Sequence, residues 1–273
     1  MADTPFDCYQ VEPGTKVSLA RHPTRDDAAF HGTKEEGMAR LADTCLDIAD
    51  LQDRLFGESE QKLLVILQAM DAGGKDSTVR DVFKETNPMG VRAVAFGEPS
   101  TNELAHDFLW RIHQHVPAAG QIAIFNRSHY EDVLIVRVRN LVARNRWRRR
   151  FRHIVEFEQM LHDEGVTICK FFLHISKEEQ RRQLQKRLDD PRKRWKFDPA
   201  DLPPRSRWDA YMTAYEEAIT ETARLHAPWY IIPADRRWYR KLAVAEIVAQ
   251  TLREMDPRYP PPAEGIDDIV IPD

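Results

Sequence analysis

Five short apolar runs, separated by stretches long enough for helices, constrain the fold of this chain more than any other feature. The runs lie at residues 62–68, 91–96, 121–125, 166–175 and 229–233. Continuous apolar runs of this length indicate strands that are buried on both faces, as in parallel sheets. Their alternation with helical stretches predicts an α/β fold, a three-layer α/β/α sandwich with a parallel sheet.

The segments around these runs predict the domain organisation. Apolar residues at helical spacing predict helices at residues 34–55 (ending at Gly57), 102–115, 148–162 and 177–188. Residues 1–33 mix proline, glycine and charges without a period, which predicts an irregular N-terminal arm. No repeat or low-complexity linker divides residues 34–260, so we expect one domain there, followed by a surface tail at residues 261–273.

The composition limits the kinds of partner and compartment. A net charge of −4 means that an anion site must be built locally from clustered Lys and Arg. Cys8, Cys45 and Cys169 form no CxxC pair, which argues against a disulfide framework or zinc site and favours a reducing compartment. No apolar run approaches the roughly 20 residues of a membrane span. We therefore expect a cytoplasmic protein that does not engage a membrane.

A glycine-containing loop between a predicted strand and a predicted helix carries the main chemical signal. The sequence there is LLVILQAMDAGGKDSTVR, and we expect the helix to open at about Asp76. Backbone N–H groups and the positive end of the helix dipole would then point at one spot. Gly73 and Gly74 allow an anion to approach and permit positive φ, and Lys75 adds a mobile ammonium group. This is a Walker A loop, except that Ala69 replaces the first glycine and Asp76 the usual Ser or Thr.

Asp71 is an unusual addition to such a loop. A carboxylate inside a phosphate cradle would repel the ligand unless a cation lies between them, so we interpret Asp71 as a ligand of Mg²⁺, or of Mn²⁺ in its place. The alternative interpretation is a Gly-Gly turn that carries surface charges.

A second cluster follows the run at residues 121–125. Asn126 and Arg127 stand at the carboxyl end of that strand, where ligands bind in open α/β sheets. A Walker B strand would end in Asp here, and Asn126 can offer a metal only a neutral oxygen. Arg127 offers a planar fork suited to a phosphoryl oxygen. We expect His129 to satisfy a local hydrogen bond, because the attacking oxygen of a nucleotide phosphate is already ionised and needs no base.

A basic stretch at about residues 181–210 forms the third cluster. It begins as a helix, breaks at Pro191 and continues with four cations around Trp195. Nucleotide kinases close a basic lid over their phosphates, which excludes water and adds charge. The alternative is a solvated helix and loop, but the position after the penultimate core strand favours a helical lid.

These segments together resemble the polyphosphate kinase 2 family. The similar phrases include LLVILQAMDAGGKDST, FNRSHYEDVLIVRV, DPRKRWKFDPADL and APWYIIPADRRWYR, and the resemblance covers roughly residues 30–260. It is closest to the class III branch, whose members act on both nucleoside mono- and diphosphates. The resemblance implies a P-loop kinase fold like that of thymidylate kinase, assembled as a homotetramer. It also implies reversible, magnesium-dependent transfer from polyphosphate to AMP and ADP, or to GMP and GDP.

The resemblance implies catalytic roles for four residues. Asp71, Lys75 and Arg127 match the aspartate and lysine of the family's loop and its strand-end arginine. Asn126 stands where other members carry Asp, which leaves the second protein ligand of the metal open.

The resemblance also implies which residues contact the substrates. Glu131 stands where relatives that phosphorylate once often carry Asn, and we expect it to bind the nucleotide together with Arg127 and Arg137. The residues expected to bind polyphosphate are Ala72, Gly73, Gly74, Lys75, Asp76, Ser77, Arg80, Arg187 and Lys196.

Two other functions are compatible with parts of the sequence. An ATP-dependent nucleotide kinase would use the same loop but should ignore long-chain polyphosphate. A nucleic-acid-binding module would use residues 144–152, where six arginines are interleaved with two aromatic residues. Trp147, Phe151, Ile154 and Phe157 share a helical face that could instead pack inward. We therefore expect no nucleic-acid function.

Overall fold

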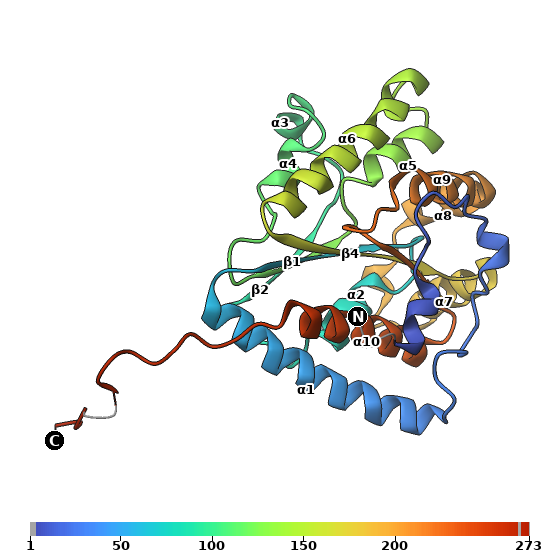
Figure 1. Ribbon diagram of the computed structural model, residues 1–273. Coiled ribbons are helices and arrows are strands. Elements are labelled where there is room, and N and C mark those ends of the chain that lie inside the picture. Colours follow the sequence, from blue (N-terminus) through green and yellow to red (C-terminus); the bar gives the residue numbers. More distant parts are fainter. Residues whose placement is uncertain (1–3, 267–268, 273) are drawn as a thin grey trace.

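The computed structural model describes residues 4–266 and 269–272, and it contains a five-stranded parallel sheet in the order β2-β3-β1-β4-β5 (Figure 1). The α/β fold predicted from the sequence is confirmed. The strands lie within one residue of the predicted runs: β1 (Lys62–Gln68), β2 (Val91–Ala95), β3 (Ile122–Asn126), β4 (Val166–His174) and β5 (Trp229–Pro233).

Helices cover both faces of the sheet (Figure 1). One layer holds α1 (Lys34–Glu58), α2 (Lys75–Val82) and α10 (Arg237–Met255). The opposite layer holds α3 (Thr101–Leu104), α4 (Trp110–His113), α5 (Glu131–Val138), α6 (Arg144–Asp163) and α9 (Trp208–Thr222). The segment after β4 contains α7 (Lys177–Asp189), the 3₁₀ turns η3 (Arg194–Lys196) and η4 (Pro199–Asp201), and α8 (Leu202–Ser206). In the described part of the chain, no helix is both long and apolar enough to cross a bilayer.

The position of each strand in the sheet explains its burial. β1 lies at the centre, and its apolar residues, Leu63 to Leu67, are fully buried because helices cover both sides. β2 differs from the prediction: it is an edge strand, and Arg92, Ala93 and Ala95 are exposed. A short apolar run therefore marks a strand but does not by itself place that strand inside the sheet.

Three predicted helices differ from the observed ones by more than one residue. The helix predicted at residues 148–162 begins four residues earlier, at Arg144. The helix expected at residues 102–115 is broken into α3 and α4, because the Asp107 carboxylate accepts from the Leu109 backbone N–H at 2.9 Å and so competes with the helix. Helix α1 continues past Gly57 to Glu58 and ends at Ser59, which adopts a left-handed conformation with φ of 54°. A helical glycine costs stability but does not end a helix that is held by packing.

The N-terminal arm is irregular and held against the domain. It contains the 3₁₀ turns η1 (Pro5–Tyr9) and η2 (Leu19–Arg21), with the side chains of Phe6 and Tyr9 buried. The Val11 backbone N–H donates to the carbonyl oxygen of Trp229 at 2.8 Å. The described residues from Arg258 onward are exposed and run away from the body (Figure 1). The predicted arm and tail also include residues 1–3, 267, 268 and 273, which lie outside the described residues.

A buried polar network lies between β4 and the layer of α5, α6 and α9. The Lys170 ammonium is 2.5 Å from a Glu158 carboxylate oxygen, and both side chains are fully buried. Tyr130 donates to Glu158 at 2.8 Å, and His129 Nε2 lies 3.2 Å from the same oxygen. His129 thus satisfies a local hydrogen bond, as expected. Burial acts to raise the pKa of Glu158, but Lys170 and His129 more than offset it and hold this pKa below its ordinary value.

We expect Lys170→Met to lower the free energy of unfolding by about 3–5 kcal/mol, because it leaves the Glu158 charge buried without its partner. The double variant Lys170→Met/Glu158→Gln should recover part of this loss, since the amide carries no charge. Urea unfolding followed by circular dichroism measures both. Equal losses in the single and double variants would contradict the assignment of a buried charge pair.

Candidate active site

The register of the central strands brings the two predicted clusters together. Leu67 of β1 pairs with Asn126 of β3, and the Arg127 backbone N–H donates to the Leu67 carbonyl oxygen at 3.0 Å. The loop after β1 and the turn after β3 therefore start side by side at the carboxyl edge of the sheet. Arg127 adopts φ of 63°, a left-handed conformation that a non-glycine residue rarely takes, immediately after the strand ends.

We call residues 69–74 the glycine loop. Positive φ occurs at Ala72 (59°) and Gly74 (95°), whereas Gly73 is not left-handed. Gly73 is instead required for space, because a Cβ there would lie 2.6 Å from the Ala69 Cβ and 2.7 Å from the Met70 carbonyl oxygen. The sequence-based interpretation that both glycines supply positive φ is thus correct for Gly74 and wrong for Gly73. The helix that follows, α2, starts at Lys75, one residue before the predicted opening.

Arg240 of α10 fixes the glycine loop from behind. Its guanidinium donates to the Thr78 hydroxyl at 3.0 Å, the Ser77 hydroxyl at 2.9 Å and the Gly73 carbonyl oxygen at 3.3 Å. The side chain is only 3% exposed, and burial lowers its pKa to about 10. A Cβ on Gly74 would lie 2.3 Å from an Arg240 nitrogen, so this arginine also requires glycine at that position.

Lys75 is buried inside the loop. Its ammonium donates to the Ala69 carbonyl oxygen at 2.9 Å and so points back over the loop. Burial lowers the pKa of Lys75 and Arg127 adds to this effect, whereas the carboxylates of Asp71, Glu131 and Asp76 oppose it. The predicted lysine therefore lies among three carboxylates and one arginine.

Asp71 and Arg127 form an ion pair at 2.7 Å, with side chains 18% and 38% exposed. Two of the predicted catalytic residues are thus in direct contact. Gln180 of α7 donates to the Asp71 carbonyl oxygen at 3.0 Å, which joins α7 to the glycine loop.

Asn126 and Glu131 are two further predicted residues near the glycine loop. The Asn126 amide nitrogen donates to an Asp76 carboxylate oxygen at 2.7 Å, which joins the end of β3 to the start of α2. Glu131 begins α5, and burial raises its pKa against the opposing effect of Arg127 and Lys75. With the Gln68 amide oriented so that both of its ends are satisfied, its nitrogen lies 3.0 Å from Glu131.

A cavity of about 510 Å³, here called the loop cavity, opens between the glycine loop and the segment that contains α7 and η3. Helix α7 and the 3₁₀ turn η3 thus face the glycine loop across the cavity, which is the arrangement expected of a lid. Within this segment, Arg187 donates to the Lys196 carbonyl oxygen at 3.1 Å. All nine residues predicted to bind polyphosphate line this cavity: Ala72, Gly73, Gly74, Lys75, Asp76, Ser77, Arg80, Arg187 and Lys196.

The remaining predicted site residues do not line the loop cavity: Asp71, Asn126, Arg127, Glu131 and Arg137. The first four lie around Lys75 and Asp76, which do line it, whereas Arg137 lies farther along α5. It lies six residues after Glu131, about 9 Å along the same helix. It forms an ion pair with Glu217, and its guanidinium lies 4.7 Å from the centre of the Trp147 ring. Its role in nucleotide binding stays a prediction.

The arginine-rich stretch has a structural explanation. Trp147, Phe151, Ile154 and Phe157 are buried, so this face of α6 packs inward. Arg150 is also buried and donates to an Asp132 carboxylate oxygen at 2.8 Å.

Four further cations line the loop cavity and were not predicted as site residues: Lys186, Lys193, Arg237 and Arg240. A signal for the last two was present in the sequence. They follow β5 within seven residues, and the carboxyl ends of all parallel strands meet at the same edge. Lys186 and Lys193 belong to the basic stretch from which only Arg187 and Lys196 were chosen.

The side chains at the loop fit Mg²⁺ in one respect. Mg²⁺ is commonly held by one or two carboxylates together with substrate phosphates and water, rather than by a complete protein cage. Asp71, within the glycine loop, offers such a carboxylate. No cluster of three or more His, Cys, Asp or Glu arranged to hold a metal occurs among residues 4–266 and 269–272. A cation here would therefore depend on substrate oxygens.

Comparison with known proteins identifies the family. The family model described as "Polyphosphate kinase 2 (PPK2)" matches residues 31–260. A protein of Meiothermus ruber named AMP/ADP-polyphosphate phosphotransferase is 53% identical over 96% of this chain and 98% of its own length. An ADP-polyphosphate phosphotransferase of Rhodopseudomonas palustris is 41% identical over 92% of this chain and 91% of its own.

The fold agrees with the sequence comparison. The crystal structure of polyphosphate kinase 2 from Arthrobacter aurescens TC1 superposes with a TM-score of 0.94 at 39% identity, over 98% of this chain and 95% of that one. The resemblance that the sequence indicated is thereby confirmed, and the chain belongs to the polyphosphate kinase 2 family.

Proposed function

We propose that this protein transfers phosphoryl groups from inorganic polyphosphate to AMP and ADP, reversibly and with Mg²⁺. The observation that carries the choice of donor is the lining of the loop cavity. Eight of its residues are cationic and two are acidic, and none of the described residues that line it is aromatic. Such a cavity can neutralise a polyanion but has no ring on which an adenine could stack, which favours polyphosphate over ATP as the donor.

The 53% identical relative supports the choice of acceptors, because its name includes both AMP and ADP. Guanine nucleotides remain alternative acceptors, because none of the described residues at the site identifies which base is bound. Use of both acceptors is what the class III assignment implies. Glu131 is proposed to lie at the acceptor, beside Arg127.

The proposed chemistry is an exchange of one phosphoanhydride bond for another. An ionised oxygen of the acceptor's terminal phosphate bonds to the end phosphorus of the donor, and the bond from that phosphorus to the rest of the chain breaks. The glycine loop and Lys75 hold the donor, while Arg127 meets the charge on the group in transfer. A bound Mg²⁺ would neutralise phosphate oxygens in this arrangement, with Asp71 as its protein ligand and the Asn126 amide oxygen close by.

Self-association and a cytoplasmic location also belong to this proposal. Helix α1 exposes Met38, Leu46 and Phe56, which makes this helix a candidate interface between copies of the chain. The homotetramer implied by the resemblance would be measured by sedimentation velocity.

A coupled assay tests the function. Purified protein with long-chain polyphosphate and magnesium should form ATP from ADP, and form ADP and ATP from AMP. Product from ADP alone would contradict the class III assignment. Formation of ADP from ATP and a nucleoside monophosphate, with no turnover of polyphosphate, would mean that the donor is wrong.

Lys75→Ala should lower kcat with polyphosphate by about 10²-fold or more, the usual effect of removing one preorganised charge. Lys84→Ala is a matched control, because Lys84 follows α2 on the surface and forms an ion pair with its neighbour Glu85. Thermal melting of both variants separates loss of activity from loss of fold. Turnover of Lys75→Ala within a few-fold of the parent would show that the glycine loop is not the donor site.

Asp71→Asn should raise the Mg²⁺ concentration needed for half-maximal rate by roughly 10-fold, because the carboxylate is the stronger ligand. Asp76→Asn is the comparison, since that carboxylate lines the loop cavity and accepts from the Asn126 amide, but is not the proposed metal ligand. Rates measured across a magnesium titration distinguish the two. An identical requirement in Asp71→Asn and the parent would remove Asp71 from the proposed metal site.

A further inference from the structure

A short turn with a fully buried middle connects two of the predicted site residues. We call residues 127–131 the arginine turn. It begins at Arg127 and ends at Glu131, and its three middle side chains are 0% exposed. Arg127 takes its left-handed φ of 63° at the start of this turn. Because a strained backbone persists only where the surrounding structure fixes it, the contacts of the buried middle residues determine where the Arg127 guanidinium points.

The hydroxyl of Tyr130 anchors the arginine turn to three other elements. It donates to the Glu158 carboxylate of α6 at 2.8 Å and accepts from the Lys170 ammonium of β4 at 3.0 Å. It also lies 3.0 Å from the Thr222 hydroxyl oxygen of α9. The Tyr130 ring packs edge-on against Trp229 of β5, with ring centroids 4.8 Å apart. Burial and the Glu158 charge raise the pKa of Tyr130 well above its ordinary value, so the hydroxyl stays protonated and can donate.

Gln68, the last residue of β1, holds the arginine turn at a second point. In the orientation that satisfies both ends of its amide, the amide oxygen accepts from the Ser128 backbone N–H at 3.1 Å, and the nitrogen lies 3.0 Å from a Glu131 carboxylate oxygen. Inside the turn, the Tyr130 backbone N–H donates to the Ser128 hydroxyl at 3.2 Å. The arginine turn is thus fixed both to β1 and to the buried polar network.

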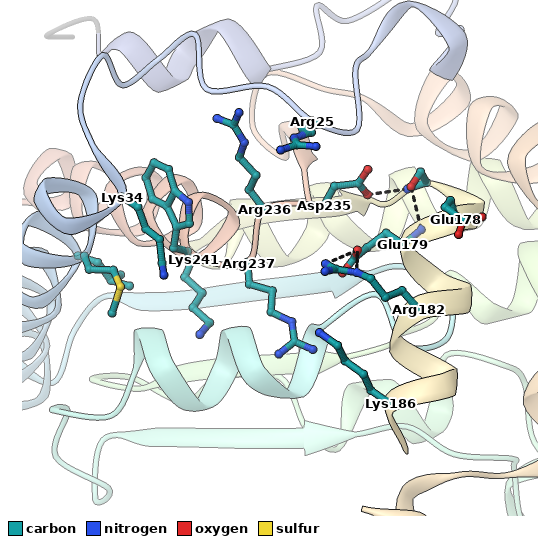
Figure 2. Close-up of a pocket in the computed structure, with 14 residues that line it drawn as sticks. Arg25, Lys34, Glu178, Glu179, Arg182, Lys186, Asp235, Arg236, Arg237 and Lys241 are labelled. Atoms are coloured by element: carbon teal, nitrogen blue, oxygen red, sulfur yellow. Dashed lines mark hydrogen bonds and ion pairs between the residues drawn. The ribbon is translucent and has the colours of Figure 1, made fainter. Parts of the chain in front are cut away.

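The donor side of the site is built from other elements. A larger cavity, of about 730 Å³, adjoins the loop cavity, and Lys186 of α7 and Arg237 of α10 line both. Figure 2 shows the charged ends of these two residues directed toward one another. No residue of the arginine turn lines either cavity. A change confined to the arginine turn should therefore alter the transfer step and leave donor binding as it is.

We propose that Tyr130 is a positioning residue for phosphoryl transfer: its hydroxyl holds the arginine turn on the buried network and thereby aims the Arg127 guanidinium at the group in transfer. This inference rests on the proposed function. Without the hydroxyl, the aromatic ring and the pair of Lys170 with Glu158 stay in place, but the turn loses its polar anchor and Arg127 can relax from its strained conformation. Displacing a group that acts on the transition state lowers kcat rather than substrate binding.

The variant Tyr130→Phe, which removes only the hydroxyl, tests the inference with polyphosphate and ADP as substrates. We expect kcat to fall about 5- to 20-fold and KM for polyphosphate to stay within about 2-fold of the parent. Tyr9→Phe is the matched control, because Tyr9 is also buried and its hydroxyl also contacts two polar groups, those of Tyr239 and Asp26, but it belongs to the N-terminal arm. Its kcat should match that of the parent. Rates are measured well below the melting temperature of each variant.

A double-mutant cycle with Arg127 separates positioning from a general loss of structure. In the background Arg127→Ala, Tyr130→Phe should lower kcat by less than about 2-fold, since the group that Tyr130 positions is gone. Equal factors in the two backgrounds would mean that Tyr130 acts elsewhere, and would overturn the inference. An unchanged kcat in Tyr130→Phe would overturn it too, as would equal losses in Tyr130→Phe and Tyr9→Phe, or a loss seen only as a higher KM for polyphosphate.

Neutralising the buried charges gives a second route to the same test. In the variant Lys170→Met/Glu158→Gln, the introduced amide oxygen can still accept from the Tyr130 hydroxyl, and neither member of the charge pair is left without its partner. Tyr130→Phe added to that variant should again lower kcat by about 5- to 20-fold relative to it. No fall there would overturn the inference even if the single variant did not fold.

Failure of the proposed function gives a different result. If the parent used ATP but no polyphosphate as the phosphoryl donor, the donor assignment would be wrong. The same kcat ratios, measured with ATP as the donor, would then decide the inference about Tyr130.

Discussion

The pairing of β1 with β3 is the constraint on which the site depends. Because Leu67 stands opposite Asn126, the glycine loop and the turn that carries Arg127 emerge together at one edge of the sheet. The ion pair between Asp71 and Arg127 at 2.7 Å connects these two segments. A shift of one residue in this register would turn every side chain of one strand to the opposite face and separate the pair.

Gathering positive charge at this edge costs free energy before any substrate binds. The structure limits that cost in two ways. Arg240 is only 3% exposed and donates hydrogen bonds to the glycine loop and to α2. Its positive charge is therefore partly compensated by these acceptors, and the same bonds fix the shape of the loop. Asp71, Asp76 and Glu131 lie around Lys75 and partly balance it. A site arranged in advance needs little reorganisation during phosphoryl transfer.

The sequence predicted the sheet and the glycine loop well, because both depend on local signals. The apolar runs marked all five strands, and the loop signal needed only the strand before Gly73 and the helix after it. Contacts made through tertiary structure were harder to predict. Arg240 reaches the loop from more than 160 residues away, so no local pattern connects them. Arg137 lies near Glu131 in sequence, but helix geometry turns it to Glu217.

The most direct test of the central claim is a crystal structure of the protein with a short polyphosphate whose bridging oxygens are replaced by methylene groups, which prevents transfer. We predict electron density for a chain of phosphate groups that starts at Gly73, Gly74 and Lys75 and passes between the glycine loop and helix α7. Density for the analogue elsewhere, with the loop cavity empty, would contradict the assignment of this cavity to the polyphosphate donor.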